Sequence, residues 1–84
     1  MKLLLVEWMD ANGVNRDWED LDNYTALLPT MRSVGWVVHE TETLLCVCPH
    51  YCEKTGDIGH QGCGIMTIPK VAIVSRKELV GIVQ

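Results

Sequence analysis

The segment 46–63 holds most of the side chains in this chain that could bind a metal or act as nucleophiles. It contains all four cysteines and two of the three histidines. Thiolates and imidazoles are the ligands that zinc takes in tetrahedral sites. The residues are Cys46, Cys48, His50, Cys52, His60 and Cys63.

The spacing of these residues divides them into two groups. Cys46 and Cys48 are two apart on an expected strand, on the same face as Leu44, so they are predicted to point into the core as small apolar side chains. Cys52, His60 and Cys63 follow in a loop, and with His50 as a fourth partner they are the first ligands to consider if zinc binds. The spacing departs from the C-x-x-C of zinc knuckles, so a reduced loop without metal is favoured.

Catalysis by these thiols needs more than a neighbouring histidine. A Cys-His pair also requires an orienting group and an oxyanion site, and the sequence contains no motif for either. We therefore expect no enzymatic activity and no cofactor. A Cys52–Cys63 disulfide is not expected either, because cytosolic thiols stay reduced.

Length and charge limit the classes of partner. The 84 residues are expected to form one domain, residues 1–84, with 7 Lys+Arg against 11 Asp+Glu and a net charge of −4. This charge disfavours duplex nucleic acid. The apolar start, residues 1–6, is too short for a signal peptide or a membrane span, so a cytoplasmic protein without membrane contact is expected.

Period-two alternation of apolar residues predicts an all-β fold. Two long segments rich in turn formers, residues 9–30 and 50–64, are predicted to be loops, the first with one helical turn within 17–28. Five short strands close their edges most economically as a small, strongly curved barrel. The predicted strands are 2–9, 31–40, 43–49, 64–69 and 71–80.

A candidate ligand edge lies at the start of the second strand. Gly35 lets another backbone or a ligand approach closely, although a sharp bend of the barrel is the favoured explanation for this glycine. Arg32 is the expected partner of a phosphate, beside Ser33. Trp18 could stack on a base, and Asp10 joins these ligand candidates with turn capping as its alternative role.

The first strand carries apolar residues on both faces. Leu3 and Leu5 point away from the face of Leu4, Val6 and Trp8, and a small barrel cannot bury both sets. An exposed apolar strip of this kind is typical of an interface. A homo-oligomer is therefore expected.

Three segments resemble a group of uncharacterised phage and prophage proteins. They are residues 6–10 (VEWMD), 33–37 (SVGWV) and 68–73 (IPKVAI), together with Leu79. The resemblance implies an Sm-like small barrel that forms oligomers. It also implies a role such as sequestering a nucleotide-like signal of host defence, or blocking a defence protein.

Two functions compete at this point. The first is binding of a small nucleotide-like ligand, and the second is docking onto a protein through the acidic loop from Asp10 to Asp22. A third, RNA binding in the Sm manner, is disfavoured by the net charge. We favour the ligand narrowly.

Overall fold

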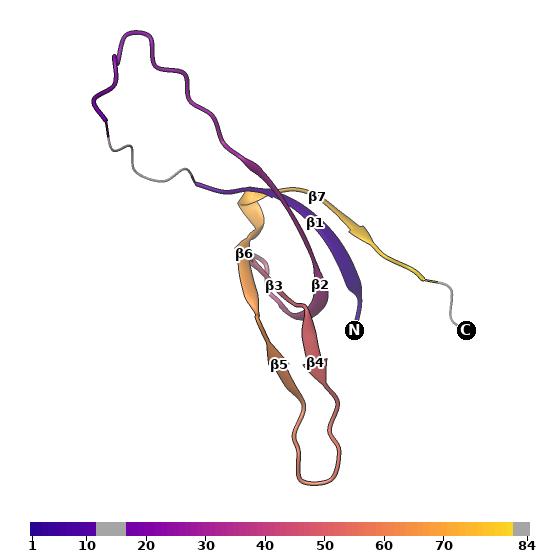
Figure 1. The fold of residues 1–84 in the computed structure, drawn as a ribbon. Helices are drawn as coiled ribbons and strands as arrows, with labels where there is room; N and C mark the ends of the chain where they lie inside the picture. Colours follow the sequence, from indigo (N-terminus) through magenta and orange to yellow (C-terminus); the bar gives the residue numbers. More distant parts are fainter. Residues whose placement is uncertain (12–16, 82–84) are drawn as a thin grey trace.

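The protein is a curved antiparallel sheet from which two arms extend (Figure 1). The computed structural model describes residues 1–11 and 17–81. Five strands of this part form one sheet in the order β6-β3-β2-β1-β7, and two more, β4 and β5, pair only with each other. The elements are β1 (Leu3–Met9), β2 (Thr30–Glu40), β3 (Leu44–Cys48), β4 (His50–Cys52), β5 (Gln61–Cys63), β6 (Met66–Pro69), the 3₁₀ turn η1 (Lys70–Ala72) and β7 (Ile73–Glu78).

The core lies on the inner, concave face of the sheet. Alternation along β1 places Leu4 and Val6 on this face, and Trp8 packs against the cluster from the same side. Residues of β3 and β6 complete it, since Leu45 lies opposite Ile68. The buried cluster is Leu4, Val6, Leu45, Val47 and Ile68.

Two irregularities bend the sheet. The register shifts between Val37 and His39 where β2 pairs with β3, and between Glu7 and Trp8 where β1 pairs with β7. Such bulges increase twist and curvature. The all-β prediction is confirmed, but the sheet does not close into the predicted barrel, because β6 and β7 stay unpaired edges joined by η1.

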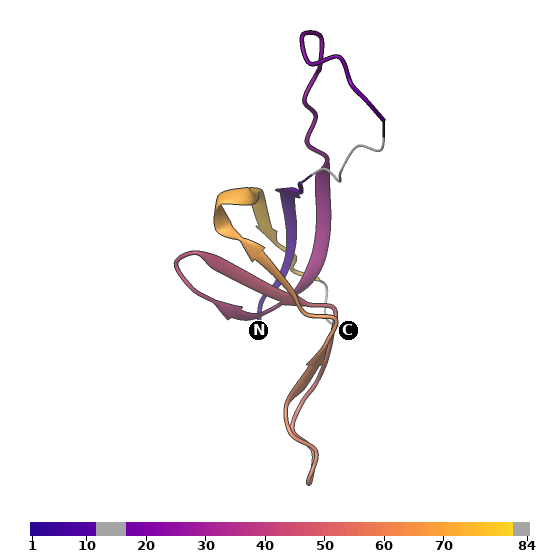
Figure 2. The same cartoon turned by 90° about the vertical axis from the view of Figure 1, so that its left-hand side faces the viewer.

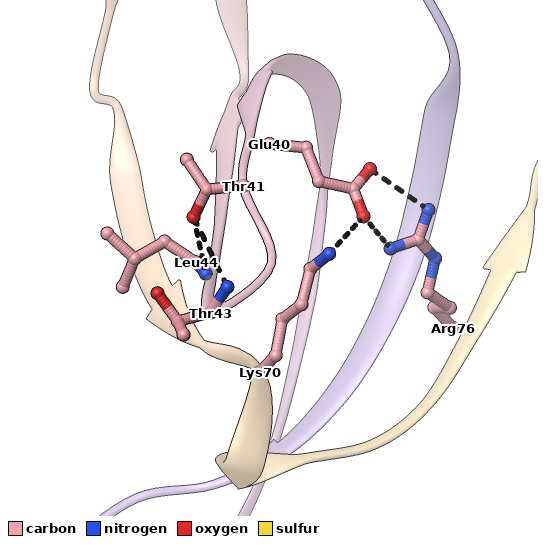
Figure 3. A network of polar contacts seen from close by, with 6 residues as sticks. All are labelled: Glu40, Thr41, Thr43, Leu44, Lys70 and Arg76. Atoms are coloured by element: carbon pink, nitrogen blue, oxygen red, sulfur yellow. Dashed lines mark hydrogen bonds and ion pairs between the residues drawn. The ribbon is translucent and has the colours of Figure 1, made fainter.

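An ion network connects η1 and β7 to the end of β2 (Figure 3). The Glu40 carboxylate accepts hydrogen bonds from Arg76 at 2.8 and 3.3 Å and contacts the Lys70 ammonium at 2.7 Å. The Lys70 amide also donates to the Thr43 carbonyl at 2.8 Å. These cations lower the pKa of Glu40 to about 2, with the Arg76 hydrogen bonds as the largest cause. The network therefore stabilises the join between the two sheet edges.

The strands of the sheet match the predicted ones closely, and the two predicted loops do not behave alike. Residues 50–63 form a hairpin of β4 and β5 instead of a loop. The helical turn predicted within 17–28 is wrong: the chain makes a tight turn at Asp20–Asn23, where the Asn23 amide donates to the Asp20 carbonyl at 3.3 Å.

The two arms make the molecule elongated. We call residues 17–29 the acidic arm and residues 50–63 the hairpin arm, and they leave the sheet in opposite directions (Figure 2). The extents are 61 × 28 × 26 Å and the radius of gyration is 17.5 Å. A compact chain of this length would have a radius of gyration of about 12 Å. Much of the chain is therefore surface.

Candidate functional site

The predicted ligand residues do not converge on one site. Arg32 lies on the outer face of the sheet, 67% exposed, with its Nε 3.7 Å from the Glu7 carboxylate. Ser33 lies on the inner face, where its hydroxyl accepts a hydrogen bond from the Trp8 indole at 3.0 Å. Neighbouring residues of a strand point to opposite faces. Arg32 and Ser33 therefore cannot contact one small ligand together.

The space beside Gly35 is occupied by β3. A Cβ at this position would lie 3.0 Å from the Cys48 amide nitrogen and 3.1 Å from the Val47 Cβ. The close approach that glycine permits is therefore made by another backbone, which leaves the buried Gly35 no room to contact a ligand.

The last two ligand candidates lie beyond the sheet. The Asp10 carboxylate accepts the amide hydrogen of Ala11 at 2.8 Å, and the Asp10 amide donates to the Pro29 carbonyl at 3.2 Å. Asp10 thus lies directly after β1, at the base of the acidic arm. Trp18 is fully exposed on the acidic arm.

Cys46 and Cys48 are buried, as predicted, but not in the core cluster. Both are among the buried apolar residues, but they lie on the face of β3 opposite to Leu45 and Val47, which belong to the main cluster. The Cys48 thiol donates to the carbonyls of His50 at 2.7 Å and Cys63 at 3.3 Å. It therefore lies under the base of the hairpin arm and connects both of its strands to β3.

The hairpin separates the proposed zinc ligands. His50 pairs with Cys63 and Cys52 pairs with Gln61, so these side chains share one face of the arm. His60 contacts Tyr51 on the other face, and the structure does not bring Cys52, His60 and Cys63 together. Within residues 1–11 and 17–81, no three His, Cys, Asp or Glu side chains are grouped as metal ligands.

An aromatic row runs from the sheet onto the hairpin arm. The rings of Trp36 and Tyr51 meet edge to face with centroids 5.1 Å apart, and those of Tyr51 and His60 with centroids 5.9 Å apart. A surface hollow of about 340 Å³ lies against this row, lined by Met1, Tyr51, Glu53, Lys54 and His60. The sequence analysis missed this hollow, because it treated residues 50–63 as an irregular loop.

The acidic arm concentrates charge and exposed apolar surface. It holds four of the eleven acidic residues and no basic residue, so the remaining seven acidic residues balance the seven basic ones. The arm thus carries the whole net charge of −4. Hydrogen bonds from the Asn23 side chain and the Asp22 amide lower the pKa of Asp20. The exposed apolar residues of the arm are Trp18, Leu21, Tyr24, Leu27 and Leu28.

Comparison with protein-family models finds no match, and comparisons with curated proteins and with solved structures likewise find none. The described part of the chain has no helix with the length and apolarity needed to cross a bilayer.

Proposed function

We propose that this protein acts by binding rather than by catalysis, and that the acidic arm docks onto a basic surface of a protein partner. The observation that carries this proposal is the coincidence of the net charge with a row of exposed large apolar side chains in one arm. Trp18 is fully exposed and Leu21 is 86% exposed. Aromatic anchors such as tryptophan supply much of the affinity of such contacts, while charges steer and orient them.

A photo-crosslinking residue at position 18 tests this docking in cells, with the same residue at position 71 as the control. Val71 is also fully exposed, but it lies in η1, away from the arm. We expect one dominant adduct from position 18, to a partner identified by mass spectrometry, and none from position 71. The purified partner should bind at least tenfold more weakly to an Asp20→Asn/Asp22→Asn variant and in high salt. Equal adducts from both positions would contradict the proposal.

The hollow beside Tyr51 supports a second candidate function, binding of a small nucleotide-like ligand. The Tyr51 and His60 rings offer faces or edges on which a planar base could pack, and the Lys54 ammonium could pair with a phosphate. In this proposal Lys54 replaces Arg32 as the phosphate partner, because Arg32 lies on the sheet and does not line the hollow.

Calorimetry with a panel of cyclic nucleotides and ADP-ribose tests this second candidate. If a ligand binds in the hollow, Lys54→Ala should weaken it by about 1.5 to 3 kcal/mol, the usual size of a charge-assisted hydrogen bond. Arg32→Ala is the matched control and should leave the affinity unchanged. Absence of binding across the panel, or loss of binding in the Arg32 variant alone, would exclude the hollow as a binding site for a nucleotide-like ligand.

The relation of the sheet to an Sm-like barrel and the phage origin of the protein are also proposals. We infer that the curved sheet is an open form of the Sm-like barrel. The turn η1 connects the edge strand β6 directly to the edge strand β7, and Glu40 of β2 forms ion pairs with Lys70 of η1 and Arg76 of β7. The resemblance to phage proteins supports a role in the host cytoplasm against a defence component. The excess of acidic residues continues to disfavour RNA.

A further inference from the structure

We propose that the partner of the acidic arm is a second copy of this chain, whose outer sheet face receives the arm. This inference rests on the proposed docking function and names its partner. The receiving surface, here called the outer patch, consists of Leu3, Leu5, Val34 and Trp36.

The outer patch is an apolar surface opposite to the core. Leu3 pairs with Trp36 and Leu5 pairs with Val34, so all four side chains lie on the face of β1 and β2 that Leu4 and Val6 do not use. Val34 is 52% exposed, and the other three are partly buried. This confirms the expectation that Leu3 and Leu5 point away from the core, and it provides a surface for the apolar side chains of an arm.

Basic residues border the outer patch. Lys77 of β7 lies directly opposite Leu5, and Arg32 lies two residues before Val34 on the same face. The only ion pair that the described residues show for Arg32 is the 3.7 Å contact with Glu7, and its side chain remains 67% exposed. A chain without its arm has no net charge, so these two cations lie where an arm of charge −4 would be attracted.

The geometry points to an arm from another molecule. The arm leaves the sheet at the end where Met9 pairs with Thr30, and it extends away from the sheet (Figure 1). The outer patch begins at the other end of the same strand pair, where Leu3 meets Trp36. Arm and patch are different surfaces, so their contact is head-to-tail. Repetition of such a contact gives a ring or an open chain.

Sedimentation equilibrium of the whole chain tests the inference over a concentration series. An arm variant, Trp18→Ser/Leu21→Ser, and a patch variant, Val34→Glu/Lys77→Glu, should each weaken self-association at least tenfold. Val71→Ser removes an equally exposed apolar side chain outside both surfaces and should self-associate as the wild type does. Circular dichroism of each variant verifies that the sheet is retained, since every substituted side chain is exposed.

Mixing the two variants separates this head-to-tail contact from a symmetric one. The arm variant keeps an intact patch and the patch variant keeps an intact arm, so the mixture should form a complex of one copy of each that does not grow further. A wild-type mass of 9.4 kDa at every concentration would overturn the inference, as would assembly that survives the arm substitutions. If the wild type is monomeric while position 18 crosslinks to a different, basic protein, the docking function stands and only the identity of the partner is wrong.

Discussion

The two arms differ in composition, since the acidic arm has four acidic residues and no glycine, and of the two only the hairpin arm forms strands. Both are rich in turn-forming residues. The hairpin arm is held by backbone pairing of β4 with β5, by the Cys48 thiol beneath it and by the contact of Tyr51 with Trp36. The contacts of the acidic arm include the local turn at Asp20–Asn23 and, at its base, the hydrogen bond between Asp10 and Pro29.

The difference shows which interactions order a protruding segment in a small β protein. At the tip of the hairpin, Thr55 and Ile58 exchange two backbone hydrogen bonds of 2.9 Å around Gly56 and Asp57. Gly56 has a φ of +58°, which the first central residue of a tight hairpin turn requires and which glycine adopts without strain. The acidic arm leaves its apolar side chains in solvent instead. An arm of this kind gains stability only when a partner covers it.

The largest expected effect comes from filling the space under the hairpin arm. A Cβ at Gly62 would lie 2.9 Å from the Cys48 sulfur, so Gly62→Ala should lower the free energy of unfolding by about 1 to 3 kcal/mol. Gly59→Ala is the control, because no atom lies within 4 Å of its Cβ position. Urea denaturation measures both variants. In a Cys48→Ala background the cost of Gly62→Ala should fall, and an unchanged cost would show that the thiol is not the obstacle.

Truncation of Tyr51 should weaken the attachment of the hairpin arm to the sheet. An edge-to-face aromatic pair contributes about 0.5 to 1.5 kcal/mol beyond its buried area. Tyr51→Ala should therefore destabilise the protein by at least this amount, while Tyr51→Phe retains the ring and should stay near the wild type. Thermal unfolding distinguishes them. Equal stability of the alanine variant and the wild type would mean that the arm is as independent of the sheet as the acidic arm is.

Acid should affect the sheet network and the acidic arm differently. The pKa of Glu40 falls from its ordinary 4.5 to about 2 in the folded protein, so its contribution is complete above pH 4.5 and is lost as the pH falls toward 2. Glu40→Gln should flatten the pH dependence of unfolding in this window. Asp20 also has a lowered pKa, but its partners are local residues of the arm, so Asp20→Asn should change the curve less. A larger effect of Asp20→Asn than of Glu40→Gln on the pH dependence of unfolding would mean that the acidic arm contributes to the stability of the folded sheet.

The smallest expected effect on stability is that of Trp18→Ala. The side chain is fully exposed, so its removal should change the free energy of unfolding by less than about 0.5 kcal/mol. Denaturation of dilute protein measures this value, with Trp8→Ala as the contrasting variant, because Trp8 packs on the core and donates to Ser33. If Trp18→Ala lowered the free energy of unfolding as much as Trp8→Ala does, the acidic arm would have to pack against its own sheet.

The sequence predicts the sheet well because its signal is local. Alternation along β1 identifies the strand and, through Leu4 and Val6, its core face, whereas on β3 the sequence predicted the face of Leu44 to point into the core and the cluster contains Leu45 and Val47 instead. The hairpin arm was missed because three-residue strands carry no period, although Gly56-Asp57 between Thr55 and Ile58 is a recognisable turn signal. Closure of a barrel depends on the pairing of β6 with β7, which no local pattern reports.

The candidate site was predicted less well. The grouping of Arg32 with Ser33 overlooked the alternation that had correctly placed the core, since adjacent strand residues face opposite ways. The same alternation separates the residues named as zinc ligands, since Cys52 lies on one face of the hairpin arm and His60 contacts Tyr51 on the other. The acidic loop, by contrast, was recognised from its charge alone, and the structure adds the exposure of its apolar side chains.

Amide hydrogen exchange at two protein concentrations tests most directly the claim that the acidic arm is exposed to solvent in one chain and covered by another. In dilute protein we predict protected amides in β4 and β5 and unprotected amides in residues 17–29. At the concentration where the chain self-associates, exchange of residues 17–29 should slow, and Val34→Glu/Lys77→Glu should restore fast exchange. Protection of the arm in dilute protein, or equally fast exchange at both concentrations, would contradict the account.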